Sequence, residues 1–376
     1  MSAIRKPLMP LWCLQAGSTL KLLIEVSTYC MAMVWWFRHV GHGQAISLLA
    51  VVGFVFAAAA VQGIGRVVTA RLQGMAIWYF RIWPFEFEPH RRGVRWRTTF
   101  NKGGDDIVVI TSPDRSRRKA YMWLAASAPL SHAVACIVAD AAGDLLGVGI
   151  AAQWLHAFAI LNVGLALAEL VPAYWPNYSG MLSLLAWYRR GECSSSERAN
   201  DRLVWLSYTG TTADRIPPEL LQELEQQGTM MRLIALWTRM KAAQNLGEWA
   251  KTADLEQARV ALTASFGSAD TMAGAAKLDA HLKLELDFSQ AMQHRDAAAV
   301  PNVVDADLLW YAPHLQPRLQ ALRSALQGDA AGMEDGLAAA QRLAYKSRNL
   351  ALHESEDRIA DHVRAVLLRP ASLTAD

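Results

Sequence analysis

The chain has little cysteine and little net charge. Only four of its 376 residues are cysteine (Cys13, Cys30, Cys136 and Cys193), and they form neither a C-x-x-C pair nor a zinc-ribbon spacing. The formal net charge is only +3, which gives no overall signal of nucleic-acid binding. The sequence also lacks a phosphate-binding loop, a nucleophile elbow and a dinucleotide fingerprint. We therefore expect no zinc ribbon and no nucleic-acid partner.

What the sequence does contain is a series of long apolar runs. Hydrophobic residues make up 53% of the chain, and a helix needs about 20 apolar residues to cross the hydrocarbon core of a bilayer. Four segments are expected to span a membrane: 19–37, 45–63, 121–142 and 148–171. In the first of them, Lys21 is expected to extend to the near membrane surface, whereas Glu25 lies deeper and requires a partner.

The distribution of basic residues between the spans predicts their orientation. The loop from Arg66 to Lys119 contains twelve Lys and Arg against five Asp and Glu, whereas the turns 37–43 and 143–147 share one Arg. The positive-inside rule therefore places the loop 66–120 and both termini in the cytoplasm. We expect an integral protein of a bacterial inner membrane.

The cytoplasmic loop has a strand-like pattern of its own. Side-chain polarity alternates over residues 78–82, 85–88 and 94–98, and Arg91-Arg92-Gly93 supplies a turn. This pattern predicts a β-hairpin or small sheet at the membrane surface. Its arginines are expected either to meet anionic lipid head groups or to form a solvated charged face.

Four short markers in the first half of the chain occur in the order typical of one membrane enzyme family. In sequence they are Arg71-Leu72-Gln73-Gly74, Trp83 to Phe87 with Arg91-Arg92-Gly93, Ser127-Ala128-Pro129-Leu130-Ser131-His132, and Glu169-Leu170-Val171-Pro172 followed by Ser179-Gly180. They resemble the Arg-Leu-x-Gly helix ending, the basic hairpin, the Ala-Gly-Pro-Leu-x-Asn helix start and the Asn-Leu-x-Pro…Asp-Gly segment of the site-2 proteases. These enzymes are intramembrane zinc peptidases. The resemblance implies a membrane domain over residues 1–191.

The resemblance also implies where zinc chemistry would lie. In the family, two histidines one helical turn apart bind Zn²⁺, a glutamate between them activates water, and a distant aspartate completes the ligand set. Counting back from Gly74 places Gln62 and Arg66 at the histidine positions and Gly63 at the glutamate position, and Ser179 stands where the aspartate is expected. We therefore expect no catalytic residue, no bound zinc and no other cofactor.

Two charged residues near the missing motif predict a replacement for the metal. A guanidinium cannot be a metal ligand, so Arg66 would supply a fixed positive charge there. Glu169 stands where the family usually has asparagine. We predict an intramembrane ion pair between Arg66 and Glu169, the alternative being that both side chains extend to the cytoplasmic interface. Gly63 and Gly65, with residues 57–60, also give the small-x-x-x-small spacing (Ala59 and Gly63) that favours close helix packing.

Two further groups of residues bear on metal binding. His132 and His156 are expected at similar depths on neighbouring helices, but two histidines without a carboxylate make a weak metal site. We expect them to be hydrogen-bonded helix residues. The segment 353–357 (His-Glu-Ser-Glu-Asp) is a near match to a zinc motif, but its fifth residue is Asp. We expect this segment to be a solvated helix face.

The composition changes after residue 191. Residues 192–215 are predicted to be a linker, residues 216–368 a soluble helical domain and residues 369–376 a tail. Within the helical domain, turn signals recur at Gly247-Glu248, Arg295-Asp296 and Gly328-Asp329. The last two are 33 residues apart, close to the tetratricopeptide period of 34. We predict an α-solenoid-like cytoplasmic domain that offers a concave surface to a protein, with a plain helical bundle as the alternative.

Together these patterns predict an all-α membrane protein of about four transmembrane helices, with a small cytoplasmic β-hairpin and a soluble α-solenoid-like domain. The expected function is that of a pseudo-protease, which binds or regulates a membrane-embedded protein or peptide client and recruits a cytoplasmic protein through its helical domain. One alternative is an active zinc peptidase with an atypical metal site that uses His132 and His156. The other is a transport or assembly component in which Glu25, Arg66 and Glu169 line a path.

Overall fold

A computed structural model describes residues 9–40, 44–99, 106–174, 179–190, 195–264 and 269–368. The predicted tail 369–376 lies outside these residues. Contacts within the chain define two compact units: Met1–Pro89 with Val94–Cys193, and His90–Gly93 with Ser194–Asp376. The division near residue 193 falls close to the predicted end of the membrane domain.

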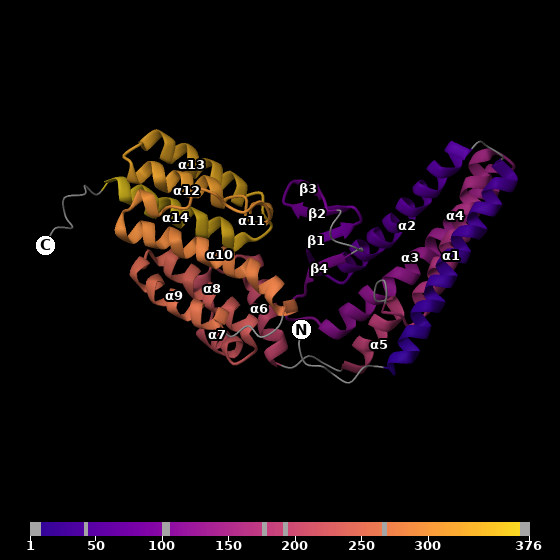
Figure 1. The fold of residues 1–376 in the computed structure, drawn as a ribbon, viewed down its shortest axis with the longest axis horizontal. Coiled ribbons are helices and arrows are strands. Elements are labelled where there is room, and N and C mark those ends of the chain that lie inside the picture. The colour runs from indigo at the N-terminus through magenta and orange to yellow at the C-terminus, as the bar shows by residue number, and fades with distance from the viewer. Residues whose placement is uncertain are drawn as a thin grey trace. The chain divides into compact units, whose positions relative to one another are not determined.

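The first unit is built on long apolar helices (Figure 1). They are α1 (Leu11–Val40), α2 (Gln44–Leu72), α3 (Arg117–Leu146) and α4 (Ile150–Leu170). Among the described residues, these four helices are long and apolar enough to cross a membrane, and each overlaps one predicted span. They indicate an integral membrane protein, as predicted from the apolar runs.

Close approach between the helices depends on small residues. Helix α4 packs against both α1 and α3, and α2 packs against α3. A Cβ atom at Gly164 of α4 would overlap the side chain of Thr28 on α1, and one at Gly65 of α2 would overlap Ser131 on α3. Because both positions lack a Cβ, neighbouring helices approach more closely than larger residues would permit.

The helix start that the family resemblance places at Ser127–His132 lies inside a helix. Helix α3 begins at Arg117, and its N-cap Ser116 accepts a hydrogen bond from the backbone N–H of Lys119 (3.3 Å). Pro129 therefore occupies an interior position, where it lacks the N–H that would bond the carbonyl of Ala125. The helix α5 (Gly180–Arg190) approaches there, since a Cβ atom at Gly180 would lie 2.8 Å from that carbonyl oxygen.

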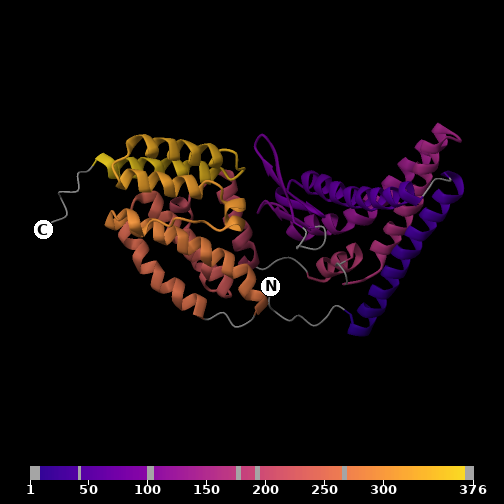
Figure 2. The same ribbon diagram turned by 45° about the horizontal axis from the view of Figure 1, so that its top comes forward.

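The loop between α2 and α3 forms a four-stranded antiparallel sheet of order β3-β2-β1-β4. Its strands are β1 (Ala76–Ile82), β2 (Phe85–His90), β3 (Gly93–Thr98) and β4 (Asp106–Ile110). The three predicted strand segments are present, and β4 extends the hairpin by pairing with β1. The strands lie at one end of α2 (Figure 1 and Figure 2). There Met75 and Ile77 are buried against Ala70 of α2 and Ala120 of α3.

A buried carboxylate organises the sheet. Glu86 on β2 is 0% exposed and accepts hydrogen bonds from Arg81 on β1 (3.2 Å) and Arg97 on β3 (3.0 Å). The prediction that the arginines of this loop either meet lipid head groups or face solvent is therefore wrong for Arg81 and Arg97. Burial of Glu86 selects them as partners, because a carboxylate without water requires compensating positive charge.

The second unit is helical, as predicted. Its elements are α6 (Ser195–Thr209), η1 (Ala213–Arg215), α7 (Pro218–Glu225), α8 (Thr229–Leu246), α9 (Trp249–Ala264), α10 (Ala269–His294), η2 (Ala297–Ala299), α11 (Ala306–Tyr311), α12 (Leu315–Leu326), α13 (Ala330–Ala344) and α14 (Leu350–Leu368). Much of the predicted linker 192–215 is in fact α6. Ala199 and Leu203 of α6 are buried against Leu220 and Leu224 of α7, so α6 belongs to the packed unit.

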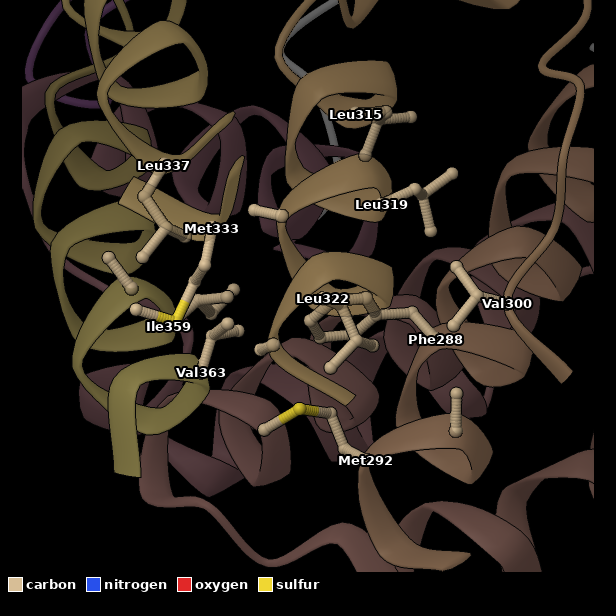
Figure 3. Packing of buried hydrophobic residues seen from close by; sticks show 14 of the residues in the cluster. Phe288, Met292, Val300, Leu315, Leu319, Leu322, Met333, Leu337, Ile359 and Val363 are labelled. Carbon is tan, nitrogen blue, oxygen red and sulfur yellow. The ribbon is translucent and has the colours of Figure 1, made fainter. Parts of the chain in front are cut away.

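The three turns predicted in this unit lie where helices end. Gly247, Arg295 and Gly328 follow α8, α10 and α12 and have positive φ, the conformation that commonly ends a helix. The core joins α10, α12, α13 and α14, and Figure 3 shows Met333 of α13 directed toward Ile359 of α14. Helix α14 also contacts α6 and α8, so the last helix returns to the beginning of the unit.

Candidate functional site

Lys21 on α1 is buried among carboxylates. Its Nζ lies 2.9 Å from Oε1 of Glu169 on α4 and 3.8 Å from Oε1 of Glu25 on α1, and the residue is 3% exposed. The expectation that Lys21 extends to the membrane surface is wrong, because Glu169 compensates its charge inside the unit. The expectation that Glu25 requires a partner is confirmed, since Lys21 lies one helical turn away.

The second oxygen of Glu169 holds the start of α5. Glu169 Oε2 accepts a hydrogen bond from the backbone N–H of Gly180 (2.6 Å). Ser179 is fully buried, and its Oγ accepts hydrogen bonds from the N–H groups of Ala173 (3.1 Å) and Leu182 (3.2 Å). Two N–H groups at the beginning of α5, those of Gly180 and Leu182, are thus satisfied by oxygen acceptors. Ser179, the position at which the family pattern has aspartate, therefore serves as a helix cap.

We call these residues the Lys21 cluster: Lys21, Glu25, Glu169, Ser179 and Gly180. The cluster joins α1, α4 and α5. Its ammonium group lies within 4 Å of two carboxylates, where a bound cation would otherwise be favoured. The arrangement therefore stabilises the packing of three helices, and it presents neither a nucleophile nor a set of metal ligands.

Gln62, Gly63 and Arg66 all lie on α2. A Cβ atom at Gly63 would lie 2.5 Å from Cγ1 of Ile82, the last residue of β1. The expectation of helix–helix packing is confirmed for Gly65, which lies against Ser131 on α3, and is wrong for Gly63, whose close neighbour is a strand. A glutamate at position 63 has no room unless Ile82 moves.

The predicted ion pair between Arg66 and Glu169 stays a prediction. A charged partner of Glu169 in the structure is Lys21, whose Nζ lies 2.9 Å from its Oε1. The sequence contains a signal for this pairing, because Lys21 and Glu169 are opposite charges on two apolar helices. Their separation of 148 residues conceals it, since a single sequence does not show which helices are neighbours.

His132 and His156 lie on the neighbouring helices α3 and α4 but contact different partners. His132 Nδ1 lies 2.8 Å from Oδ1 of Asn162, and His156 Nδ1 lies 3.1 Å from Oδ1 of Asp140. The alternative metal site that combines both histidines requires them to share one ion, which these separate contacts do not favour. Within the described ranges, no group of three or more His, Cys, Asp or Glu is placed to hold a metal ion.

The helical unit contains a buried ionic network that no local sequence pattern predicts. We call it the Arg318 network: Lys241 (α8), Glu285 (α10), Arg318 (α12) and Glu356 (α14), each at most 6% exposed. Arg318 donates hydrogen bonds to Glu356 (2.7 Å) and to Glu285, and Lys241 donates to Glu285 (2.9 Å). Each of the four helices contributes one charge, so the network joins them at the centre of the unit.

Burial and neighbouring charges shift the pKa values of the side chains in this network in different directions. Burial opposes ionisation of Glu285, but the charges of Arg318 and Lys241 outweigh it and hold the pKa of Glu285 well below its ordinary value. Burial raises the pKa of Glu356 and lowers the pKa of Lys241. Burial and the positive charges of Arg318 and Lys241 lower the pKa of the adjacent His314 well below its ordinary value. His314 is therefore neutral at pH 7.

The expectation that segment 353–357 forms a solvated helix face is wrong for two of its residues. Ser355 and Glu356 are buried, Ser355 against Asn245 and Glu356 against Arg318. The signal lies in the periodicity that follows, because Glu356 shares the face of Ile359 and Val363 at helical spacing. A charged residue on an apolar stripe indicates a buried ion pair, but the sequence alone does not identify its partner.

Comparisons with models of known protein families, with curated proteins and with solved structures find no match for this chain. The likeness to site-2 proteases therefore depends on the sequence markers.

Proposed function

We propose that the protein is a pseudo-protease of the site-2 protease type, which binds or regulates a membrane-embedded client and recruits a cytoplasmic protein. The observation that carries the proposal is the contact of Gly63 with Ile82. Gly63 stands where the family has its water-activating glutamate, and β1 fills the space that such a side chain would occupy. The position serves packing between α2 and the sheet.

The remaining marker positions support the same proposal. Ser179 caps α5, and Glu169 binds both the ammonium of Lys21 and the N–H of Gly180. Ser179, at the position of a metal ligand in the family, and Glu169, at the position of the family's asparagine, both hold helices together instead. A membrane fold that keeps its helix packing without the chemistry is suited to binding a client.

The sheet and the helical unit offer surfaces for the two partners. Strand β3 is at the end of the sheet order, and its Val94 and Trp96 are 55% and 60% exposed. An edge strand with exposed apolar side chains can pair with an extended client segment. The Arg318 network and the core around Phe288 fix the helices of the second unit. We propose that this unit recruits the cytoplasmic protein, with both termini in the cytoplasm of a bacterium.

Metal content and proteolysis test the non-catalytic part of the proposal. The purified full-length chain is expected to contain no stoichiometric zinc and to leave a single-span model substrate uncut. One tightly bound zinc per chain, together with cleavage of the substrate, would overturn the proposal in favour of an active peptidase.

Co-purification tests the binding part. The full-length chain is compared in membranes with a chain truncated after Ser196 and with a β3 variant, Val94→Lys/Trp96→Lys. The truncation is expected to lose cytoplasmic partners and keep membrane clients, whereas the β3 variant is expected to do the reverse. Loss of neither set of partners would contradict the proposed division of roles, and ion flux in vesicles would favour the transport alternative.

A further inference from the structure

A groove runs along α4 between α1 and α3. Helix α4 packs against both of these helices, and all three contribute side chains to the lining. The groove has a volume of about 550 Å³. Exposed apolar residues of α1 and α4 keep it open along one side, among them Leu23, Val163 and Leu167. We call it the α4 groove, and its lining includes Leu23, Ser27, Cys136, Asp140, Val163 and Leu167.

The α4 groove lies at the depth of the hydrocarbon core of a membrane. Its lining on α4 extends from Ala159 to Leu167, which covers about 12 Å along the axis of a helix that spans Ile150–Leu170. The hydrocarbon core is about 30 Å thick, so this part of α4 is surrounded by lipid and not by water. The occupant is therefore mainly apolar, and it is either a lipid acyl chain or another membrane-spanning helix.

Two polar side chains in the lining favour a helix over an acyl chain. Ser27 of α1 is exposed in the groove, whereas the hydroxyl of its neighbour Thr28 donates a hydrogen bond to the carbonyl of Ile24 (2.6 Å). Asp140 of α3 also lines the groove, and its side chain is 61% exposed. An acyl chain offers no hydrogen-bond donor or acceptor, so it would leave both groups against hydrocarbon. A helix can carry polar side chains that bind them.

The charges at one end of the groove specify the helix further. Asp140 lies at this end, because it contacts His156, which precedes the lining residues of α4. The two ring nitrogens of His156 lie 3.1 Å from Oδ1 of Asp140 and 3.8 Å from Oδ1 of Asp144. Two carboxylates thus share one imidazole, which carries at most one positive charge. Because charged residues within a membrane pair with opposite charges, a basic residue on the occupant complements this end of the groove.

We infer that the α4 groove binds a membrane-spanning helix of the client, which is apolar along its length and carries a basic residue level with Asp140. This inference rests on the proposed function, since it names where the membrane-embedded client binds. The Lys21 cluster fixes the other end of the groove, because Leu23 and Leu167 each lie two residues from one partner of the ion pair between Lys21 and Glu169.

Disulfide cross-linking tests the position of the bound helix. Cys136 lines the groove, whereas Cys30 lies on α1 outside the lining and is the more exposed of the two. The full-length protein keeps one of these cysteines, its other cysteines are replaced by serine, and it is placed in phosphatidylcholine vesicles. The probe is a leucine-rich single-span peptide with one lysine and one cysteine, spaced like Asp140 and Cys136. Under copper phenanthroline oxidation, the peptide is expected to cross-link preferentially to Cys136, in spite of the greater exposure of Cys30.

A matched pair of substitutions tests whether the groove itself is occupied. Val163→Trp fills the groove, whereas Val138→Trp places the same side chain on an exposed position of α3 outside the lining. The first is expected to abolish cross-linking at Cys136 and the second to leave it unchanged.

A second pair tests the complementary charge. Asp140→Asn is expected to weaken binding of the lysine peptide by about threefold to tenfold. Binding of a peptide with leucine in place of the lysine is expected to be unchanged, which shows that the variant is folded. Asp144→Asn removes a carboxylate that lies outside the lining and is expected to keep the preference for lysine.

Equal cross-linking at Cys136 and Cys30, or equal losses from Val163→Trp and Val138→Trp, would overturn the inference and favour acyl chains as the occupants. A zinc-free chain that co-purifies membrane clients but does not cross-link the peptide at Cys136 would overturn the groove as the binding site and leave the proposed function standing. Bound zinc together with substrate cleavage would overturn the proposed function instead.

Discussion

The ammonium of Lys21 on α1 lies 2.9 Å from a carboxylate oxygen of Glu169 on α4, and the two side chains are 4% and 9% exposed. This ion pair joins the first and last apolar helices of the membrane unit. Because the other oxygen of Glu169 binds the N–H of Gly180, the same carboxylate also fixes α5. The packing of three helices therefore depends on one buried charge and its partner.

Removal of Lys21 is expected to destabilise the membrane unit strongly. The variant Lys21→Met leaves Glu169 buried, and Glu25 half-buried, without a compensating charge, which costs about 3–5 kcal/mol. The double variant Lys21→Met/Glu169→Gln is expected to recover part of this loss, since the amide oxygen still accepts from Gly180. Unfolding in mixed micelles measures the free energy of unfolding of the single and the double variant. Arg38→Gln, at an exposed position of α1, serves as the control, and equal stability of the single and double variants would contradict the coupling.

Restoring the family motif is not expected to restore zinc binding. The variant Gln62→His/Gly63→Glu/Arg66→His/Ser179→Asp supplies the missing residues, but a side chain at position 63 meets Ile82 at 2.5 Å. We expect lower thermal stability and no stoichiometric zinc, measured by calorimetry and elemental analysis. A stable variant that holds one zinc per chain would show that the sheet moves aside readily.

A smaller substitution isolates the contact between Gly63 and Ile82. Gly63→Ala is expected to lower the free energy of unfolding by about 1–3 kcal/mol through overpacking. Gly53→Ala on the same helix is the matched control, because a Cβ atom there meets nothing within 4 Å. It is expected to be neutral or to stabilise by up to about 1 kcal/mol. Chemical denaturation in micelles compares the two, and equal effects would rule out a specific packing role for Gly63.

The parts of the fold that follow from local patterns were predictable, and the parts that follow from pairing were not. The apolar runs predict the four spans, and alternation over 78–82, 85–88 and 94–98 predicts three strands of the sheet. The sequence predicts Lys21 at the membrane surface because its partner lies 148 residues away, and it predicts Glu356 in solvent because charged residues surround it in sequence. In both cases an opposite charge that is remote in sequence but adjacent in space makes burial favourable, and a single sequence does not show which remote residues are adjacent.

Arg318 is expected to be far more important to stability than an exposed arginine of the same unit. Arg318→Met leaves Glu285 and Glu356 buried without their shared partner, which costs about 3–5 kcal/mol. Arg215→Met removes an exposed pair with Glu354, whose side chains are 57% and 39% exposed, and should cost less than about 1 kcal/mol. Thermal unfolding followed by circular dichroism separates them. Similar losses would show that the Arg318 network does not hold the unit together.

His314 is expected to make the helical unit sensitive to mild acid. Burial, with Arg318 and Lys241, holds its pKa well below the ordinary value in the folded chain, whereas in the unfolded chain it titrates near 6.5. Below that pH the unfolded chain binds more protons, so the free energy of unfolding falls by about 1.4 kcal/mol per pH unit until the folded pKa is reached.

The substitution His314→Gln removes this source of acid sensitivity. Glu356, which lies 3.7 Å from His314, has a raised pKa and gains protons in the folded chain, so it acts in the opposite direction as the pH falls. The measured quantity is therefore the difference between wild type and His314→Gln in denaturant unfolding at pH 7 and pH 5. The loss in free energy of unfolding between pH 7 and pH 5 should be smaller in the variant than in the wild type by about 2 kcal/mol. His294→Gln, at an exposed position that ends α10, should leave the wild-type slope unchanged, and a similar flattening there would contradict the assignment to His314.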